Sequence, residues 1–329
     1  MNNRIKYIDF LKFIGLTGIL IAHVGSPDWL LMLRSFDVPL MVILSSLLAY
    51  TSYNKHNSKN IITYYIHRFK RLVIPVWIFL LIYFLTKYIL SGDLNRINYY
   101  IASFFLTRYG IGYVWIFLIY LYSAMLVPFF NKTGHSLKWL IVIVLSYILY
   151  ELACYFEIGT QYKILDTTFF YIIPYGILTY LGYNYSKYTL KTKYTIAISS
   201  FLIFVALAVY YWVINGSPQY VQIAKYPPRL YYLCYGITCS FGMLIFCEKH
   251  YLKLYDNRLI IYISNHSMWI YLWHILLLTT YKAMHLPEIW YIKLFSIYLV
   301  AILMVFVINK LLDYIDSKHK FIFLNYLRG

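Results

Sequence analysis

The sequence predicts an all-α membrane protein built from about ten transmembrane helices. Of its 329 residues, 62% are hydrophobic and only 12% are charged. A soluble globular protein has about a quarter charged residues and less than half apolar ones, and one water-soluble core of this size could not bury so much apolar surface. The charges fall in short runs between long apolar stretches, which is the pattern of a polytopic membrane protein.

Ten apolar stretches are long enough to cross a membrane, because about 20 helical residues span a hydrocarbon core of roughly 30 Å. In chain order they are 8–25, 36–53, 72–90, 111–130, 138–156, 168–186, 194–214, 230–248, 259–280 and 290–311. The segment 97–107 is too short to span, whereas 259–280 is expected to span despite its polar residues. We expect these helices to form a single domain over 1–329.

The positions of lysine and arginine predict the orientation, since cytoplasmic loops carry the excess of these residues. With the N-terminus inside, 19 of the 29 Lys and Arg residues lie on the cytoplasmic side and 8 on the other, while Lys12 and Lys87 fall within spans. The cytoplasmic set includes Arg4, Lys320 and Arg328 near the two ends of the chain, and Lys59 in the loop after the second predicted span. Both termini are therefore predicted to be cytoplasmic.

The net charge of +17 does not indicate a nucleic-acid partner. A nucleic-acid-binding protein gathers its basic residues on one soluble face, whereas here they separate membrane spans. Such basic loops are expected to contact anionic membrane lipids instead. The four cysteines form no C-x-x-C pair, so we predict neither a disulfide framework nor a metal site.

The first predicted span contains three ionisable residues, and such groups inside a membrane are functional candidates by default. At 100° per residue, Asp9 and Lys12 lie within about 40° of His23 on a helix, so all three share one stripe. Lys12 and His23 are about 16 Å apart along the axis. The stripe suits a polar cavity; alternatively, Asp9 and Lys12 anchor the inner interface as a pair and His23 is a structural hydrogen-bond partner.

A basic run stands at the cytoplasmic entry to the third predicted span, where His67, Arg68, Lys70 and Arg71 lie within five positions. Charge alone leaves two interpretations. The run either orients the span and binds anionic head groups, or it captures phosphate. Arg68 and Arg71 are one helical turn apart and would present two planar guanidinium groups to a diphosphate.

The ninth predicted span also carries a histidine toward its outer end. Its polar residues are Ser264-Asn265-His266-Ser267, followed by Tyr271-Leu272-Trp273-His274. This order places His274 at a depth comparable to that of His23. One intramembrane histidine is often only a hydrogen-bond partner between helices, but two at similar depth suggest a shared site.

These residues lie in motifs that resemble those of the acyltransferase-3 family of integral membrane acyltransferases. The matching runs are Tyr7-Ile8-Asp9-Phe10-Leu11-Lys12 followed after ten intervening residues by His23, Pro39-Leu40-Met41-Val42-Ile43-Leu44-Ser45-Ser46, Arg68-Phe69-Lys70-Arg71-Leu72-Val73-Ile74-Pro75, and the stretch from Ile263 to His274. Trp115-Ile116-Phe117 ahead of Pro128 is similar to a looser family element. Lys12 stands where many members have Arg, and Ser46 where Gly is usual. The resemblance covers essentially the whole chain.

The resemblance implies an integral membrane acyltransferase domain that moves an acetyl group from cytoplasmic acetyl-coenzyme A to a hydroxyl of a bacterial glycan. The acceptor would be a cell-surface polysaccharide or a lipid-linked glycan, and the enzyme would reside in the bacterial plasma membrane. Acetyl-coenzyme A would be the cosubstrate, with no metal. The anionic donor suits Arg68 and Arg71, and its long pantetheine arm suits the stripe from Lys12 to His23.

Within that function, His23 is the expected catalytic residue, because an imidazole titrates near working pH. It would act as general base for the acceptor hydroxyl or carry the acyl group itself, and the sequence leaves both routes open. Asp9 and Lys12 would hold polar groups of the donor or stabilise developing charge. The acceptor side is expected to include Asp37, Trp115, Tyr271 and His274, with Asp37 orienting His23.

The main alternative function is a transporter or flippase for a glycan or a small anionic solute. Transporters usually show inverted repeats with broken helices in matching halves, and the sequence shows neither. A third alternative is a non-catalytic subunit whose histidines only fix helix packing. The oligomeric state, including a homodimer, is left open.

Overall fold

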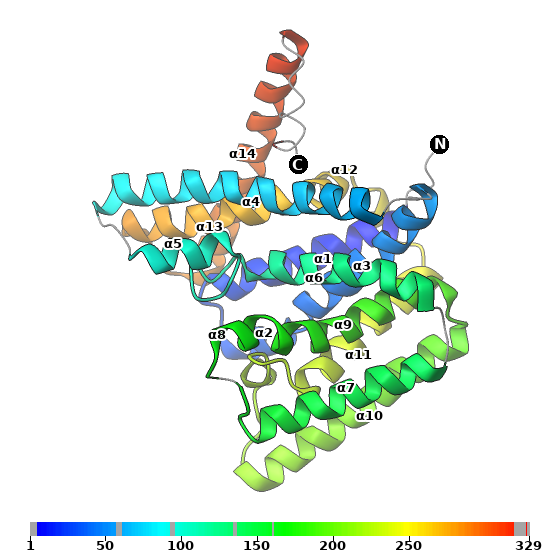
Figure 1. Ribbon diagram of the computed structural model, residues 1–329. Helices are drawn as coiled ribbons and strands as arrows, with labels where there is room; N and C mark the ends of the chain where they lie inside the picture. The colour runs from blue at the N-terminus through cyan, green and yellow to red at the C-terminus, as the bar shows by residue number, and fades with distance from the viewer. Residues whose placement is uncertain are drawn as a thin grey trace. The chain divides into compact units, whose positions relative to one another are not determined.

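The computed structural model describes residues 5–56, 61–92, 96–133, 137–159, 161–318 and 327. Within these ranges every regular element is a helix (Figure 1), which confirms the predicted all-α class. Helices suit such apolar segments because all their backbone hydrogen bonds are made within the segment. Four basic residues counted for the orientation lie outside the described residues, namely Arg4, Lys59, Lys320 and Arg328.

The long helices follow the predicted spans in order, and shorter ones connect them. They are α1 (Lys6–His23), α2 (Asp28–Leu33), α3 (Asp37–His56), α4 (Ile61–Ser91), α5 (Ile97–Phe104), α6 (Trp115–Thr133), α7 (Leu137–Tyr155), α8 (Lys163–Thr167), α9 (Phe169–Asn184), α10 (Leu190–Asn215), α11 (Leu230–Lys249), α12 (Arg258–Asn265), α13 (Ser267–Ala283) and α14 (Trp290–Lys318), with 3-10 turns η1 (Tyr185–Lys187), η2 (Val221–Ala224) and η3 (Lys253–Asp256). The segment predicted as too short to span contains only α5.

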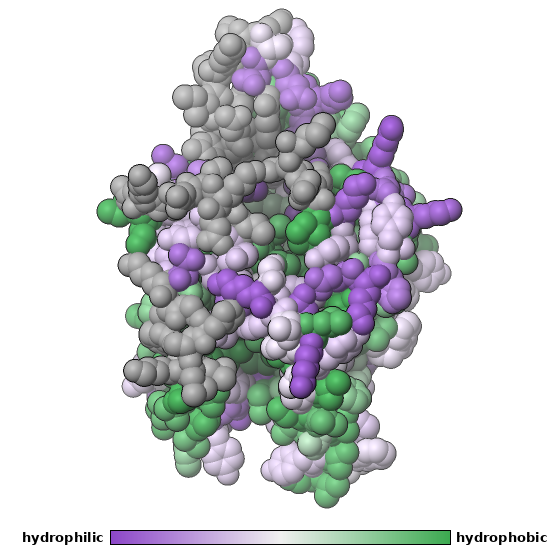
Figure 2. Space-filling model, turned by 90° about the vertical axis from the view of Figure 1, so that its right-hand side faces the viewer, coloured by the Kyte–Doolittle hydropathy of each residue, from purple (hydrophilic) through white to green (hydrophobic). Residues whose placement is uncertain are grey.

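Six stretches of the described residues are long and apolar enough to cross a membrane. They are Asp28–Tyr50, Ile61–Ser91, Lys163–Lys187, Leu190–Asn215, Leu230–Lys249 and Trp290–Ser317. Figure 2 shows strongly hydrophobic side chains (green) at the surface. In α10 the polar Lys193 and Ser200 are buried while Phe201, Leu202 and Val213 are exposed, which is the arrangement expected of a helix in lipid. The count of ten spans and the cytoplasmic termini stay predictions.

The structure divides the predicted span 259–280 into two helices. α12 ends at Asn265, α13 begins at Ser267, and His266 between them has φ −102° and ψ 16°, outside the helical region. Asn, Ser and His side chains compete with the backbone for hydrogen bonds, and the run Ser264-Asn265-His266-Ser267 places four such residues together. The helix is therefore interrupted at the polar residues of this segment.

The chain forms two compact units. Unit 1 comprises Met1–Arg34, Ile66–Phe117 and Tyr251–Gly329. In it, α1 packs against α12, α13 and α14, and its apolar core includes Val24, Leu278 and Ile297. Part of α4 belongs to the same unit, where the ring of Phe79 meets that of Trp273 edge-on, with centroids 6.3 Å apart. The N-terminal helix and the C-terminal helices thus share one core.

Unit 2 comprises Ser35–Tyr65 and Leu118–His250. In it, α3 packs against α9, and α10 against α11. The contact of α3 with α9 is close because a Cβ added to Gly182 would lie 2.4 Å from the carbonyl oxygen of Ile43. Gly236 of α11 approaches Pro39 of α3 equally closely. The two glycines therefore allow α3 to approach the backbone of α9 and α11 closely, through the Ile43 backbone at Gly182 and the Pro39 ring at Gly236.

Candidate functional site

The centre of the candidate site is a pair of histidines in unit 1. Nδ1 of His23, the last residue of α1, lies 2.9 Å from Nε2 of His274 in the middle of α13. The two rings lie edge to edge in nearly the same plane, with centroids 5.2 Å apart and planes 8° apart. His274 is completely buried, whereas His23 is partly exposed. The structure therefore brings together the two histidines that the sequence placed at similar depth.

Two tyrosine rings lie close to the ring of His23. The ring of Tyr113 meets the His23 ring edge-on, with centroids 4.7 Å apart, and the ring of Tyr271 lies at 6.4 Å. The hydroxyl of Tyr271 donates a hydrogen bond of 2.6 Å to the backbone carbonyl of Tyr113. Gly112, at φ 77°, allows the turn that brings Tyr113 to this place. Sequence reasoning missed Tyr113, since nothing distinguishes it among 40 tyrosines.

At the other end of α1, Asp9 and Lys12 contact the break between α12 and α13. The hydroxyl of Ser264 donates a 2.6 Å hydrogen bond to the buried Asp9 carboxylate. Nζ of Lys12 donates to the backbone carbonyl of Ser264, at 3.1 Å. A cation at this point is favourable because the C-terminal end of a helix carries a partial negative charge. Ser264 was also missed, although the polar run around it was the available signal.

Asp9, Lys12 and His23 thus face the same two consecutive helices, α12 and α13. Their spacing on α1 places Lys12 and His23 about 16 Å apart along the axis. The stripe is occupied by protein contacts at both ends, and these contacts orient the three side chains. Such fixed orientation is what a reacting group needs.

Arg68 and Arg71 lie one turn apart on α4, which begins at Ile61, well before the predicted start of the third span. Arg71 and the neighbouring Lys70 are exposed, and Arg68 is half-buried. The exposed Arg71 and the half-buried Arg68 suit an anionic ligand, because Arg offers planar, two-pronged donation to phosphate. Trp115 of the same unit is buried at the first turn of α6.

Asp37 belongs to unit 2. It is completely buried at the first residue of α3, and its carboxylate accepts a hydrogen bond of 2.7 Å from the backbone N–H of Val38. A carboxylate is favourable at this end of a helix. That Asp37 orients His23 stays a prediction.

No group of three or more His, Cys, Asp or Glu side chains among the described residues has the geometry to hold a metal ion. The histidine pair is held by its own hydrogen-bond contacts. Two imidazoles within hydrogen-bond distance can share a proton and accept another. This chemistry suits proton transfer or nucleophilic attack in a partly enclosed place.

Comparison with known proteins identifies the family. The acyltransferase-3 family model, described as an acyltransferase domain, matches residues 5–313. Neither a curated protein nor a solved structure matches the chain. The matched range includes α1, the basic turn of α4 and both halves of the interrupted α12–α13 segment. The chain therefore belongs to the acyltransferase-3 family and is a multi-pass membrane acyltransferase.

Proposed function

We propose that this protein transfers an acetyl group from cytoplasmic acetyl-coenzyme A to a hydroxyl of a bacterial cell-surface polysaccharide or lipid-linked glycan, in the bacterial plasma membrane. The observation that carries the proposal is the contact between His23 and the buried His274. It provides, in a chain of an acyltransferase family, an imidazole that is held in place yet still accessible. General base catalysis by a positioned histidine contributes about 10²- to 10⁴-fold to a rate.

His23 serves this reaction by one of two routes. In the direct route it takes the proton of the acceptor hydroxyl while the hydroxyl oxygen attacks the thioester carbonyl. A C–O bond forms, the C–S bond breaks, and the proton passes to the departing thiolate. In the covalent route a nitrogen of His23 attacks the thioester carbonyl first, so that an N–C bond forms, the C–S bond breaks and the thiolate leaves. The acceptor hydroxyl oxygen then attacks the same carbonyl. A C–O bond forms, the N–C bond breaks, and the hydroxyl proton passes through the released imidazole to the thiolate.

Arg68 and Arg71 are the proposed donor-binding groups. Coenzyme A carries phosphates, and the exposed turn of α4 offers two guanidinium groups on one side of the helix. Lys12 and Asp9 are proposed to act along the donor's path, oriented by their contacts with Ser264. On the acceptor side we propose Asp37, Trp115, Tyr271 and His274, of which Tyr271 and His274 adjoin His23.

The test is binding and turnover of radiolabelled acetyl-coenzyme A by the purified protein and by native membranes that contain it. The double variant Arg68→Ala/Arg71→Ala should weaken binding by about 10-fold or more, since each hydrogen bond to a charged group contributes roughly 1.5–3 kcal/mol. Lys70→Ala, which removes a neighbouring exposed charge, is the matched control and should bind nearly as the wild type does. His23→Ala should bind acetyl-coenzyme A but lose turnover.

The proposed function fails if the wild-type protein never engages acetyl-coenzyme A, in detergent or in native membranes. Equal binding by the Lys70 variant and the double arginine variant would remove only the assignment of Arg68 and Arg71. Unchanged turnover in His23→Ala would remove the chemical role of His23.

A further inference from the structure

The second ring nitrogen of His274 fixes the protonation of that imidazole. Nδ1 of His274 contacts the backbone carbonyl of Tyr271, one turn earlier in α13. A carbonyl oxygen only accepts hydrogen bonds, so Nδ1 of His274 must carry a proton. In a neutral imidazole only one nitrogen is protonated, and Nε2 of His274 is then an acceptor. Because the side chain is completely buried, the neutral form is favoured over the cation.

The state of His274 in turn determines that of His23. Nε2 of His274 faces Nδ1 of His23 at 2.9 Å, and a hydrogen bond requires one proton between the two atoms. Since Nε2 of His274 accepts, Nδ1 of His23 must donate. The lone pair of a neutral His23 is therefore on Nε2, the nitrogen on the opposite side of its ring.

We propose that His274 is a positioning residue, held by the Tyr271 carbonyl, that selects the tautomer in which Nε2 of His23 is the reactive nitrogen. This inference rests on the proposed function and adds which atom reacts and what sets it. When Nε2 takes the proton of an acceptor hydroxyl, His23 becomes an imidazolium. Its Nδ1–H continues to donate to His274, which stabilises the new charge without itself changing its protonation state.

Tyr271 has a second part in this arrangement. Its carbonyl accepts from His274, while its hydroxyl holds the backbone of Tyr113, whose ring lies edge-on against His23. One turn of α13, from Tyr271 to His274, therefore fixes His23 by hydrogen bonding from one direction and by ring packing from another.

Three substitutions of His274 separate the tautomer role from a structural one. In His274→Gln, the side-chain amide reaches the place of Nε2, and its oxygen can accept from Nδ1 of His23. In His274→Asn, the shorter amide reaches only the place of Nδ1. His274→Phe keeps a flat ring of similar size but removes the acceptor. The Gln variant should therefore preserve the tautomer of His23, and the other two should not.

The measurement is release of coenzyme A thiol from acetyl-coenzyme A by native membranes containing each full-length variant, with kcat and KM determined separately. We expect kcat to fall about 10²- to 10⁴-fold in His274→Phe and His274→Asn, and to stay within about 10-fold of wild type in His274→Gln. KM for acetyl-coenzyme A should change little in all three. Thermal unfolding in detergent shows whether each variant is folded. If His274→Phe does not fold, the comparison of kcat between His274→Gln and His274→Asn still tests the tautomer role.

Equal kcat values in the Gln and Asn variants would overturn the tautomer role, whether both are active or both inactive. That result leaves the proposed function intact, provided that the wild type is active and His23→Ala is not. A wild type without thiol release and without acetyl-coenzyme A binding would instead contradict the proposed function itself.

Discussion

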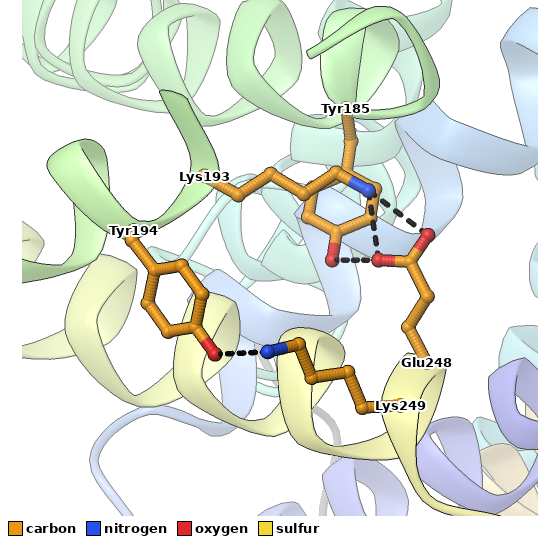
Figure 3. Close-up of polar contacts among 5 residues, drawn as sticks. All are labelled: Tyr185, Lys193, Tyr194, Glu248 and Lys249. Carbon is orange, nitrogen blue, oxygen red and sulfur yellow. Dashed lines mark hydrogen bonds and ion pairs between the residues drawn. The ribbon is translucent and has the colours of Figure 1, made fainter. Parts of the chain in front are cut away.

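The Lys193–Glu248 ion pair of unit 2 and the histidine pair of unit 1 differ in whether they can exchange a proton with a substrate. In unit 2, Lys193 at the start of α10 donates to both carboxylate oxygens of Glu248 near the end of α11, at 2.9 and 2.7 Å (Figure 3). The hydroxyl of Tyr185 donates to the same carboxylate at 3.0 Å, and Nζ of Lys193 lies 4.1 Å from the centre of the Tyr185 ring. Beside them, Lys249 donates to the hydroxyl of Tyr194 at 2.8 Å.

The cluster of unit 2 holds opposite charges that neutralise each other, and the carboxylate is satisfied by two donors. It can link α10 to α11, but it has no weakly held proton to exchange. The histidine pair of unit 1 contains two groups of the same kind, each able to donate or accept. One proton lies between the two rings, and the outer nitrogen of His23, Nε2, keeps a lone pair that can accept another proton. Complementary charge thus gives stability, whereas like groups in contact give reactivity.

The largest effect that would sharpen this contrast is on turnover. We predict that His23→Ala lowers acetyl-coenzyme A turnover about 10²- to 10⁴-fold while its midpoint of thermal unfolding in detergent stays close to that of the wild type. Glu248→Gln should instead lower the midpoint of thermal unfolding and leave turnover per folded molecule normal. The comparison would break if Glu248→Gln reduced turnover per folded molecule as strongly as His23→Ala does.

Within the unit 2 cluster, the two halves of the ion pair should differ in their effect on stability. The Lys193 side chain is 8% exposed and that of Glu248 is 37% exposed. Glu248→Gln leaves a buried cation without a counter-charge and should lower the free energy of unfolding by about 3 kcal/mol. Lys193→Met leaves a carboxylate that water can reach, so its effect should be smaller. Thermal unfolding of both variants checks the order, and the opposite order would contradict this account.

Close backbone packing is the other expected source of stability in unit 2. Gly182→Ala places a Cβ 2.4 Å from the backbone oxygen of Ile43, which cannot rotate away, and should lower the free energy of unfolding by about 1–3 kcal/mol. Gly176→Ala in the same helix is the matched control. There the nearest atom is a methyl carbon of Leu126, at 3.2 Å, and a side chain can yield. Equal unfolding midpoints for the two variants would show that α3 and α9 are not in such close contact.

The smallest predicted effect concerns the contact between Ser264 and Asp9 in unit 1. Ser264→Ala removes the donor to the buried Asp9 carboxylate and should lower the free energy of unfolding by about 1–2 kcal/mol. Ser267→Ala, three residues later and half-buried, is the control and should change it by less than about 0.5 kcal/mol. Thermal unfolding measures both, and a loss in Ser267→Ala as large as that in Ser264→Ala would argue against a specific role for the Asp9 contact.

Local patterns were sufficient to predict the helical class and most helix positions. Apolar runs of span length coincide with long helices because backbone hydrogen bonding within each run is a local property. The 100° periodicity of α1 likewise placed Asp9, Lys12 and His23 on one side, and all three contact α12 or α13. The break at His266 was not predicted, since the apolar character of 259–280 was given more weight than its polar run.

Such local patterns could not predict contacts between residues that are far apart in the sequence. His23 and His274 are 251 residues apart, and only their similar depth suggested a connection. Tyr113 lies in the loop before α6 and contacts His23 through its ring. Its backbone carbonyl accepts a hydrogen bond from Tyr271, a contact that any residue type would supply. Lys193 was counted only as a cytoplasmic charge, and no spacing indicated that Glu248 would be its partner. Partner choice depends on the packing of the whole unit, not on either residue alone.

The separation of 251 positions between the two histidines also affects when the pair can form during synthesis of the chain. A chain is made at about 5–20 residues per second, so His274 is synthesised roughly 10–50 s after His23. During that interval α1 carries Asp9, Lys12 and His23 without the α12 and α13 groups that later bind them, although uncompensated polar groups are costly in lipid. The polar groups of α1 thus find their partners only after α12 and α13 have been made. An unfinished chain has no histidine pair, and the proposed chemistry begins only when α13 is in place.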